Sequence, residues 1–201
     1  RDDVESRGLG DVYKRQAHVG SFSLVMGRHT SHPDVALFPF SYLMEQGEKT
    51  VLIPGTNLMK AGTLRDAQKW ESRDRRPAND RTDPIDYRLL SPYTVDKMID
   101  AIEWLEKELN TGNGEAAILF GSTSIPRRAA QNGIAYYRLA IDKFMGDNLT
   151  ERLEQLTLSD TRHPLASLFP RHTSSGNGKW CDLSGPVSYT HLRAHETRRH
   201  L

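Results

Sequence analysis

The sequence predicts an α+β protein in which short strands occupy the first part of the chain and helices follow. Up to residue 60, runs of β-branched and aromatic residues are separated by glycine and proline, a pattern typical of strands and turns. After residue 90, apolar residues recur every three or four positions, as on one face of an amphipathic helix. A chain of 201 residues is long enough to bury one core of this kind.

Residues 17–34 have the pattern of a repeating β-coil. Val19 and Val25 lie six positions apart, with Gly20 and Gly27 close behind them. A small apolar residue followed by glycine at a period of six is typical of the left-handed parallel β-helix, in which each hexapeptide forms one side of a triangular coil. Two hexapeptides also fit a single buried strand followed by a glycine turn, and the residues alone favour this simpler structure.

Residues 35–60 contain a predicted β-hairpin. Two strand-like runs, Phe40–Met44 and Thr50–Ile53, flank a loop at Glu45–Lys49 that contains Gly47. Hairpins whose loops contain glycine commonly have this arrangement. We therefore expect two antiparallel strands here.

A mainly helical region is predicted over residues 61–165. Leu64–Arg76 lacks glycine and proline and is rich in helix formers. A second helix should begin where Ser91 can cap its first turn and Pro92 fits the first helical position. A third helix should begin near Pro126.

Two glycine-containing stretches are expected to interrupt this helical region. Gly146 should end the third helix, and a short amphipathic helix at Leu149–Leu156 should follow it. Gly121–Ser124 reads as a loop after the apolar run Ala116–Phe120.

The two ends of the chain differ in character from the middle. Residues 166–185 turn to serine, glycine and asparagine, and we expect a polar tail without regular structure. Residues 1–16 and 186–201 resemble translated sequencing-adapter sequence, in the words "DVYKRQ" and "VSYTHLRAHET". We therefore exclude both ends from the prediction of the fold, as for other segments foreign to a domain.

The composition argues against several classes of function. The formal charge is +1, with 27 basic and 26 acidic residues, so no overall field would attract nucleic acid or an anionic membrane. No apolar run approaches the roughly 18 residues of a membrane span. Cys181 is the only cysteine, which excludes an internal disulfide and favours a reducing, cytoplasmic location.

The stretch "GRHTSHPD" holds the densest set of reactive side chains, namely Arg28, His29, Ser31, His32 and Asp34. A neutral imidazole of His29 or His32 can accept a proton, and the Asp34 carboxylate can fix its tautomer. Arg28 can bind an anion. A Ser-His-Asp triad is not expected, because sequence neighbours rarely reach that geometry. No third metal ligand stands at a recognisable spacing, so no metal site is predicted. The alternative is a polar turn whose histidines bond to the backbone.

A second candidate site lies on the first predicted helix. Arg65, Lys69 and Arg73 are four positions apart, so they share one helix face and could clamp a phosphate or carboxylate. Asp66 and Asp74 lie among them. The alternative is therefore a solvent-exposed face whose charges neutralise one another.

Several of these stretches together resemble an uncharacterised bacterial family. They are "GRHTSHPDVALFPFSYL", "GTLRDAQKWESRDRR", "LLSPYTVDKM" and "GIAYYRLAIDKF". The resemblance implies a hexapeptide-repeat left-handed β-helix followed by a helical C-terminal region, so that residues 17–34 would be the last coil. It also implies a fold similar to that of acyltransferases and sugar-nucleotide enzymes, in which a histidine base activates the acceptor at a cleft between trimer subunits.

Two functions remain open at this stage. The first is an acyl- or nucleotidyltransferase-like enzyme, a homo-oligomer such as a trimer, that would take an acyl thioester as donor and a sugar nucleotide or another anionic molecule as acceptor. In it His29 or His32 would be the base, and Arg65, Lys69 and Arg73 would bind the anion. The second is a non-catalytic region that caps the β-helix and makes subunit contacts, because an uncovered coil end exposes unpaired strand edges.

Overall fold

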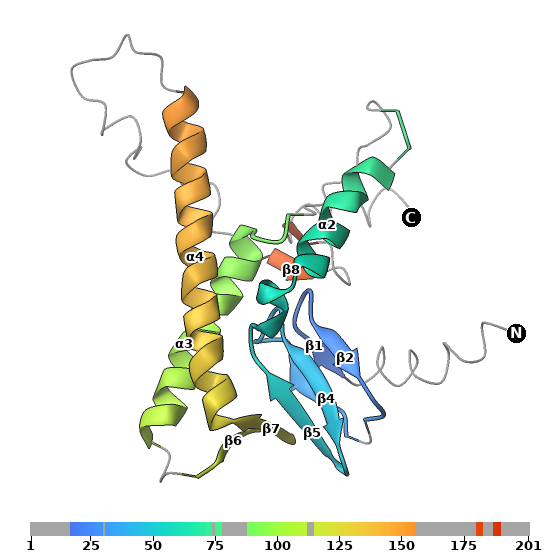
Figure 1. Ribbon diagram of the computed structural model, residues 1–201, viewed down its shortest axis with the longest axis vertical. Helices are drawn as coiled ribbons and strands as arrows, with labels where there is room; N and C mark the ends of the chain where they lie inside the picture. The colour runs from blue at the N-terminus through green and yellow to red at the C-terminus, as the bar shows by residue number, and fades with distance from the viewer. Residues whose placement is uncertain are drawn as a thin grey trace, which may run out of the picture.

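The computed structural model describes residues 17–29, 31–73, 75–77, 88–111, 115–155, 180–182 and 187–189. A five-stranded mixed sheet in the order β2-β4-β5-β7-β6 packs beside two long helices, and β1 pairs with β3 separately. Figure 1 shows β1, β2, β4 and β5 to the right of α3 and α4, with β6 and β7 below them. The elements of the first half are β1 (His18–Val19), β2 (Leu24–Met26), β3 (Asp34–Val35), β4 (Tyr42–Gln46), β5 (Lys49–Ile53), the 3-10 helix η1 (Thr56–Met59) and α2 (Ala61–Arg73). Those of the second half are α3 (Pro92–Thr111), β6 (Ala117–Phe120), β7 (Thr123–Pro126), α4 (Arg127–Gln155), β8 (Trp180–Asp182) and β9 (Val187–Tyr189).

The first four strands pair in parallel at long, nearly equal separations along the chain. Leu24 of β2 lies opposite Tyr42 of β4, eighteen positions later. His18 of β1 lies opposite Asp34 of β3, sixteen positions later. A connection of more than a dozen residues therefore precedes the return of the chain to each parallel partner strand. Val35 of β3 and Leu43 of β4 are buried.

The corner before each of β2 and β4 repeats the same unusual backbone. Phe22 has φ 58° and Phe40 has φ 56°, values that are rare for a bulky residue. Their rings stack with centroids 5.2 Å apart and 12° between the planes. The sequences that follow are also alike, "FSLVM" and "FSYLM". The two corners thus lie one above the other, eighteen residues apart.

An antiparallel hairpin lies where the sequence predicts one. β4 and β5 pair from Tyr42 opposite Ile53 to Gln46 opposite Lys49. The turn holds two residues and not the five expected, because Gly47 at φ 64° occupies its first position, where a two-residue turn needs a positive φ. The strands consequently extend to Gln46 and Lys49.

The stretch expected as a loop at Gly121–Ser124 instead includes the start of a strand. β7 pairs antiparallel with β6 and parallel with β5. Thr123 and Ile125 alternate inward and are fully buried, as a half-buried strand requires. A short run with two hydroxyl side chains gave too little apolar signal for this strand to be predicted.

The second helix begins at the predicted cap. Thr94 N–H donates to Ser91 Oγ at 3.4 Å, and Ser91 N–H donates to Thr94 Oγ1 at 2.9 Å. Such reciprocal bonds satisfy two backbone donors at the start of α3. The inner face of α3 supplies Met98, Ala101 and Leu105 to the core, each with no exposed surface.

α4 does not stop at Gly146 as predicted, and the short helix expected at Leu149–Leu156 is its continuation as far as Gln155. Side chains around the glycine reinforce this turn of the helix: Asn148 Nδ2 donates to the Phe144 carbonyl at 2.7 Å, and Thr150 Oγ1 donates to the Gly146 carbonyl at 2.9 Å. A glycine inside a helix costs only about 1 kcal/mol. The helix of 29 residues therefore tolerates both of its glycines, Gly133 and Gly146.

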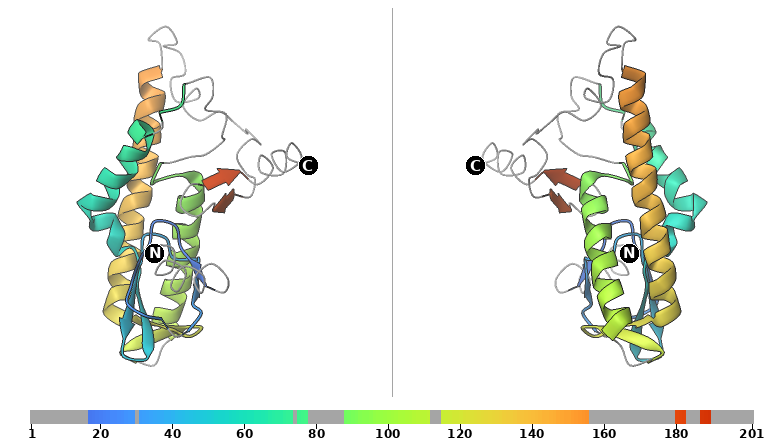
Figure 2. Two further views of the ribbon diagram at one scale, coloured as in Figure 1. Left: turned by 90° about the vertical axis from the view of Figure 1, so that its right-hand side faces the viewer. Right: turned by 90° about the vertical axis from the view of Figure 1, so that its left-hand side faces the viewer.

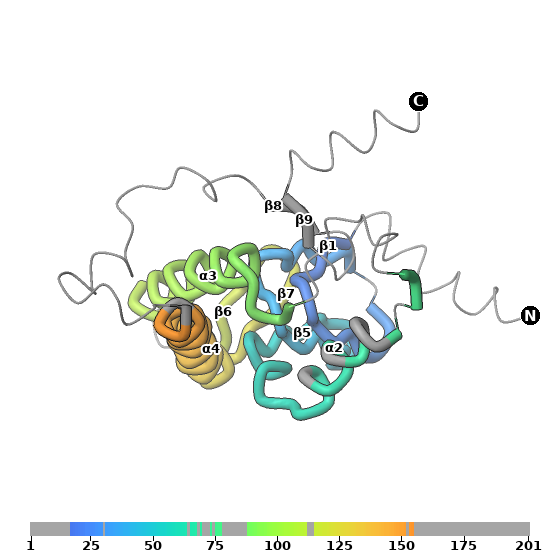
Figure 3. The backbone as a smooth tube through the Cα atoms, turned by 90° about the horizontal axis from the view of Figure 1, so that it is seen from above, coloured from blue at the N-terminus to red at the C-terminus, as the bar shows by residue number. Residues whose placement is uncertain are grey.

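The first half of α4 packs against α3 and against the end of β5. Figures 2 and 3 show α3 and α4 running side by side. Gly133 lies so close to the sheet that a Cβ atom there would be 2.7 Å from Pro54 Cβ. Tyr137 is fully buried, and its hydroxyl donates to the Pro39 carbonyl at 2.7 Å. Burial raises the pKa of this phenol well above its usual value.

Two expectations concern the ends of the chain and the bilayer. The polar tail at 166–185 includes a strand, since β8 pairs antiparallel with β9; the rest of that tail, residues 1–16 and most of 186–201 lie outside the described residues. Within the described part of the chain, none of the helices combines the length and apolar character that crossing a bilayer requires.

We predict that Gly133→Ala destabilises the protein while Gly146→Ala stabilises it. The first substitution forces a methyl group against Pro54, and such overpacking costs about 1–3 kcal/mol. The second places a methyl group in open space and raises helix propensity by about 1 kcal/mol. Urea unfolding followed by circular dichroism measures both. Equal midpoints for the two variants would contradict the close packing of α4 on Pro54.

Candidate functional site

His29 stands at the centre of a polar cluster between the loop after β2 and the start of β5. Its Nδ1 lies 2.9 Å from Thr50 Oγ1, and its Nε2 lies 3.1 Å from the Met26 carbonyl oxygen. Ser31 Oγ lies 3.1 Å from the same Thr50 oxygen. Thr50 is 2% exposed, whereas His29 and Ser31 are half-buried. The cluster therefore reaches from the interior to the surface.

The other reactive residues of the predicted loop do not join this cluster. His32 is exposed. Asp34, expected to orient a histidine base, instead lies 3.3 Å from His18 Nδ1, with both side chains 71% exposed. The pairing of β1 with β3 places these two residues opposite each other, and alternation along β3 directs Asp34 outward while Val35 is buried.

Arg28 contributes its backbone to the site. Its N–H donates to Glu45 Oε2 at 2.7 Å, which attaches the loop to the end of β4. The residue as a whole is exposed. Its guanidinium is thus the cation next to His29 in the sequence, on the solvent side of the loop.

The predicted cations of α2 are largely exposed and two of them pair with an acid on their own helix. Lys69 Nζ lies 3.0 Å from Asp66 Oδ1, and Arg65 Nε lies 3.4 Å from the same atom. The hydrogen bond from Lys69 is the main cause that holds the pKa of Asp66 below its ordinary value of 3.8. Arg73 is exposed at the end of the helix. This geometry fits the alternative of mutually neutralised charges.

The larger of two hollows that border α2 lies between η1, the segment before α3 and the outer side of α4. Its volume is about 640 Å³, within the range usual for small-molecule sites. Its walls are mostly apolar. The lining residues are Phe40, Asn57, Leu58, Met59, Thr63, Ala67, Arg88, Leu89, Leu90, Tyr136, Leu139, Ala140, Lys143 and Asp147.

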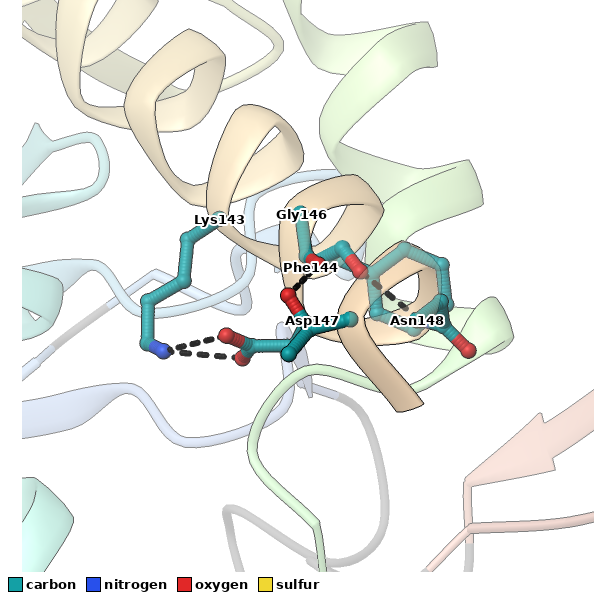
Figure 4. A network of polar contacts seen from close by, with 6 residues as sticks. Lys143, Phe144, Gly146, Asp147 and Asn148 are labelled. Carbon is teal, nitrogen blue, oxygen red and sulfur yellow. Dashed lines mark hydrogen bonds and ion pairs between the residues drawn. The ribbon is translucent and has the colours of Figure 1, made fainter. Parts of the chain in front are cut away.

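A charged pair on α4 forms part of the wall of this cavity. Lys143 Nζ lies 2.8 and 3.0 Å from the two oxygens of Asp147, one helical turn further along (Figure 4). Both side chains are more than 60% exposed. An ion pair this exposed contributes little to stability. Lys143 and Asp147 place one cation and one anion on the α4 wall of the cavity.

A second hollow of about 460 Å³ adjoins the first and shares Asn57, Thr63 and Ala67 with it. Lys60 and Asp66 line it as well. The anion-binding helix predicted from the sequence therefore borders a real hollow, but through Asp66 and not through Arg65, Lys69 or Arg73.

The structure separates the two halves of the predicted enzyme site. Thr50, which contacts His29, is next to the β4–β5 turn, whereas α2 follows the opposite end of β5. Figure 1 shows α2 at the far end of the hairpin from that turn. His29 lines neither hollow. Within the described ranges, no three histidine, cysteine, aspartate or glutamate side chains are grouped so that they could hold a metal.

Nothing in the sequence indicated that Thr50 is part of the site. A threonine in a strand normally reads as a β-former, and only the return of β5 past the His29 loop gives it a role. The cavity lining was missed for a similar reason. Its residues come from η1, α2, α4 and the segment before α3, which no sequence periodicity connects.

Comparison with known proteins identifies a domain in the first half of the chain. A domain of unknown function (DUF4954) is found at residues 12–109. It includes the polar cluster around His29, both parallel strand pairs, the hairpin and most of α3. No curated protein and no solved structure matches the chain. The described geometry is therefore the basis for any statement about activity.

We predict that Lys69→Gln raises the pKa of the Asp66 carboxyl toward 3.8, because it removes the hydrogen bond that is the largest cause of the lowering. The pH dependence of the Asp66 side-chain carboxyl ¹³C shift measures this. Lys143→Gln, which removes a similar pair on α4, serves as the control and should leave Asp66 unchanged. An unaltered Asp66 titration in Lys69→Gln would contradict the pairing of Lys69 with Asp66.

Proposed function

We propose that the part of the protein from β1 to α4 closes the end of a stack of parallel β-coils. The observation that carries the proposal is the eighteen-residue repeat of the corner at Phe22 and Phe40, with matching φ angles and stacked rings. Repetition of one backbone corner at a fixed interval is what stacked coils require, because each coil must place its strands over those of the next.

The repeat of parallel strands ends with β4, the strand that follows the second corner. β4 turns back into β5 as an antiparallel hairpin, and β5 then pairs with β7. Asn57, in η1, binds both corners: its N–H donates to the Phe40 carbonyl at 2.8 Å and its Nδ2 donates to the Phe22 carbonyl at 2.6 Å. These bonds satisfy backbone acceptors that another coil would otherwise have to cover.

An aromatic cluster joins the coil to the helical region. Phe38 lies edge-on to Trp104 of α3 and to Phe120 of β6, with ring centroids 5.7 and 4.9 Å apart, and Trp104 and Phe120 are 4.8 Å apart. Edge-to-face contacts of this kind add about 0.5–1.5 kcal/mol each to the burial of the rings. The helices thus fit the role of a packed cover over the coil.

The edge of the sheet at β2 indicates the side on which a preceding coil would stack. β2 is an edge strand of the five-stranded sheet, and β1 pairs only with β3 among the described residues. An exposed strand edge is a template for another strand. In the proposed arrangement the preceding coil pairs there.

We predict that the chain, joined at Ala17 to a β-helix protein stripped of its own terminal cap, restores solubility and one cooperative unfolding transition. Asn57→Ala in the same fusion should lower the stability by about 1–3 kcal/mol, since it leaves the part-buried Phe22 carbonyl without its donor. Asn148→Ala, which removes a similar side-chain bond within α4, is the matched control. Aggregation of the fusion, or two independent transitions, would contradict the capping role.

A transfer reaction is our second proposal, and the observation that favours it is the arrangement of His29. The imidazole is half-buried and held on both nitrogens, as a base that must keep one orientation needs to be. Arg28 is the cation beside it for an anionic acceptor, while an acyl thioester would be the donor. Arg65, Lys69 and Arg73 take no part in this version of the proposal.

For this second function, His29→Ala should reduce acyl transfer to an anionic acceptor by at least about a hundredfold. His32→Ala should leave the rate nearly unchanged, because His32 is exposed and stands apart from the cluster. Steady-state assays of the purified chain with an acetyl thioester measure both. Equal rates in the two variants would eliminate His29 as the base.

A further inference from the structure

The hydrogen bonds around His29 have only one arrangement of protons when the ring is neutral. The Met26 carbonyl oxygen can only accept, so His29 Nε2 carries the hydrogen that it donates over 3.1 Å. Nδ1 then holds a lone pair and accepts the Thr50 hydroxyl hydrogen over 2.9 Å. Because that hydrogen is committed, the 3.1 Å contact between Ser31 and Thr50 is a bond donated by Ser31.

A directed chain of protons therefore leads from Ser31 Oγ through Thr50 Oγ1 to His29 Nδ1. We propose that Ser31 is a nucleophilic serine whose hydroxyl proton passes through Thr50 to His29 when it attacks an activated acyl ester or thioester. This proposal goes beyond the capping role and does not depend on it. It also differs from transfer to an external acceptor, because the acyl group is first received by the protein.

The step is balanced without any further reagent. Ser31 Oγ forms a bond to the acyl carbon and the ester or thioester bond breaks. As the bond forms, the Ser31 proton moves to Thr50 Oγ1 and the Thr50 proton moves to His29 Nδ1. The departing alkoxide or thiolate takes the added proton from the imidazolium and leaves as the alcohol or thiol, so that His29 and Thr50 regain their starting protonation while Ser31 carries the acyl group.

Burial in the cluster favours transfer along this chain over exchange with water. Thr50 is 2% exposed, and its neighbour across the parallel β5–β7 pair, Thr123, has no exposed surface. In the described part of the chain the Thr123 hydroxyl has no hydrogen-bond partner. Burial of a hydroxyl without a hydrogen-bond partner costs folding free energy. The Thr123 hydroxyl is thus an unpaired polar group on the strand next to Thr50.

The loop that carries the relay is fixed to the hairpin on both sides of the imidazole. The Arg28 N–H bond to Glu45 precedes His29, and the Ser31 bond to Thr50 follows it. Each bond links the loop to a different strand of the hairpin. Such preorganisation keeps the nucleophile and the base in register before a substrate arrives.

Acetylation by p-nitrophenyl acetate tests the proposal on the whole chain, with the modified serine located by peptide mass spectrometry. Ser31 should be acetylated at least about tenfold faster than Ser122, an exposed serine in the β6–β7 turn. Ser31→Ala should abolish the fast acetylation. His32→Ala should leave it unchanged.

Variants of Thr50 separate the relay from a structural role. Thr50→Val removes the hydroxyl at nearly constant shape and should slow acetylation at least about tenfold, whereas Thr50→Ser should restore it. If Thr50→Val does not fold, His29→Gln gives the same test because it removes the base. Acetylation of Ser31 no faster than of Ser122 would overturn the proposal, and so would equal rates in the Thr50→Val and Thr50→Ser proteins.

Discussion

The rest of the structure depends on the pair of left-handed corners at Phe22 and Phe40. A bulky residue adopts a positive φ only where its surroundings hold it there, and here the two rings stack on each other. Backbone bonds add to this, since Phe40 N–H donates to the Ser21 carbonyl and Leu24 N–H donates to the Ser41 carbonyl, both at 2.8 Å. The two corners direct β2 and β4 in the same direction, side by side, and so form the parallel pair at one edge of the sheet.

The helices are attached to the same corner from the other side. Tyr137 of α4 donates to the Pro39 carbonyl and lies 3.3 Å from Ser41 Oγ. Its hydroxyl is buried among groups that immediately precede and follow Phe40. The depth of this contact explains why Gly133, one turn earlier on α4, has no room for a side chain. A helix that supplies a buried tyrosine to a backbone carbonyl has little freedom to slide.

This arrangement also decides where chemistry is feasible. The corner and its covering helices occupy one end of the hairpin, together with the two hollows beside α2. The other end holds the His29 cluster, where Thr50 and Thr123 are buried and Ser31 is half-buried. The cavity and the polar cluster around His29 are therefore separate features, which lie at opposite ends of the hairpin.

The local sequence signals were most informative where a short segment decides its own structure. Ser91 and Pro92 start α3 because capping depends on neighbours within one turn. The hairpin was expected from glycine and two β-rich runs, although the type of turn and the length of the strands were not. Gly146 misled the prediction, because the packing of the rest of α4 outweighs the small cost of one glycine in a helix.

The sequence by itself determined the site of the hairpin, the cap of α3 and the reactive loop that contains His29 and Ser31, but not that β6 and β7 lie between α3 and α4. Only the tertiary structure decided that Thr50 completes the polar cluster and that Asp34 faces His18 and not His32. The physical reason is range. Propensity, capping and turn geometry act within a few residues. Strand pairing and the packing of a loop on a strand bring together side chains sixteen and twenty-one positions apart, and nothing in their local sequence indicates that they meet.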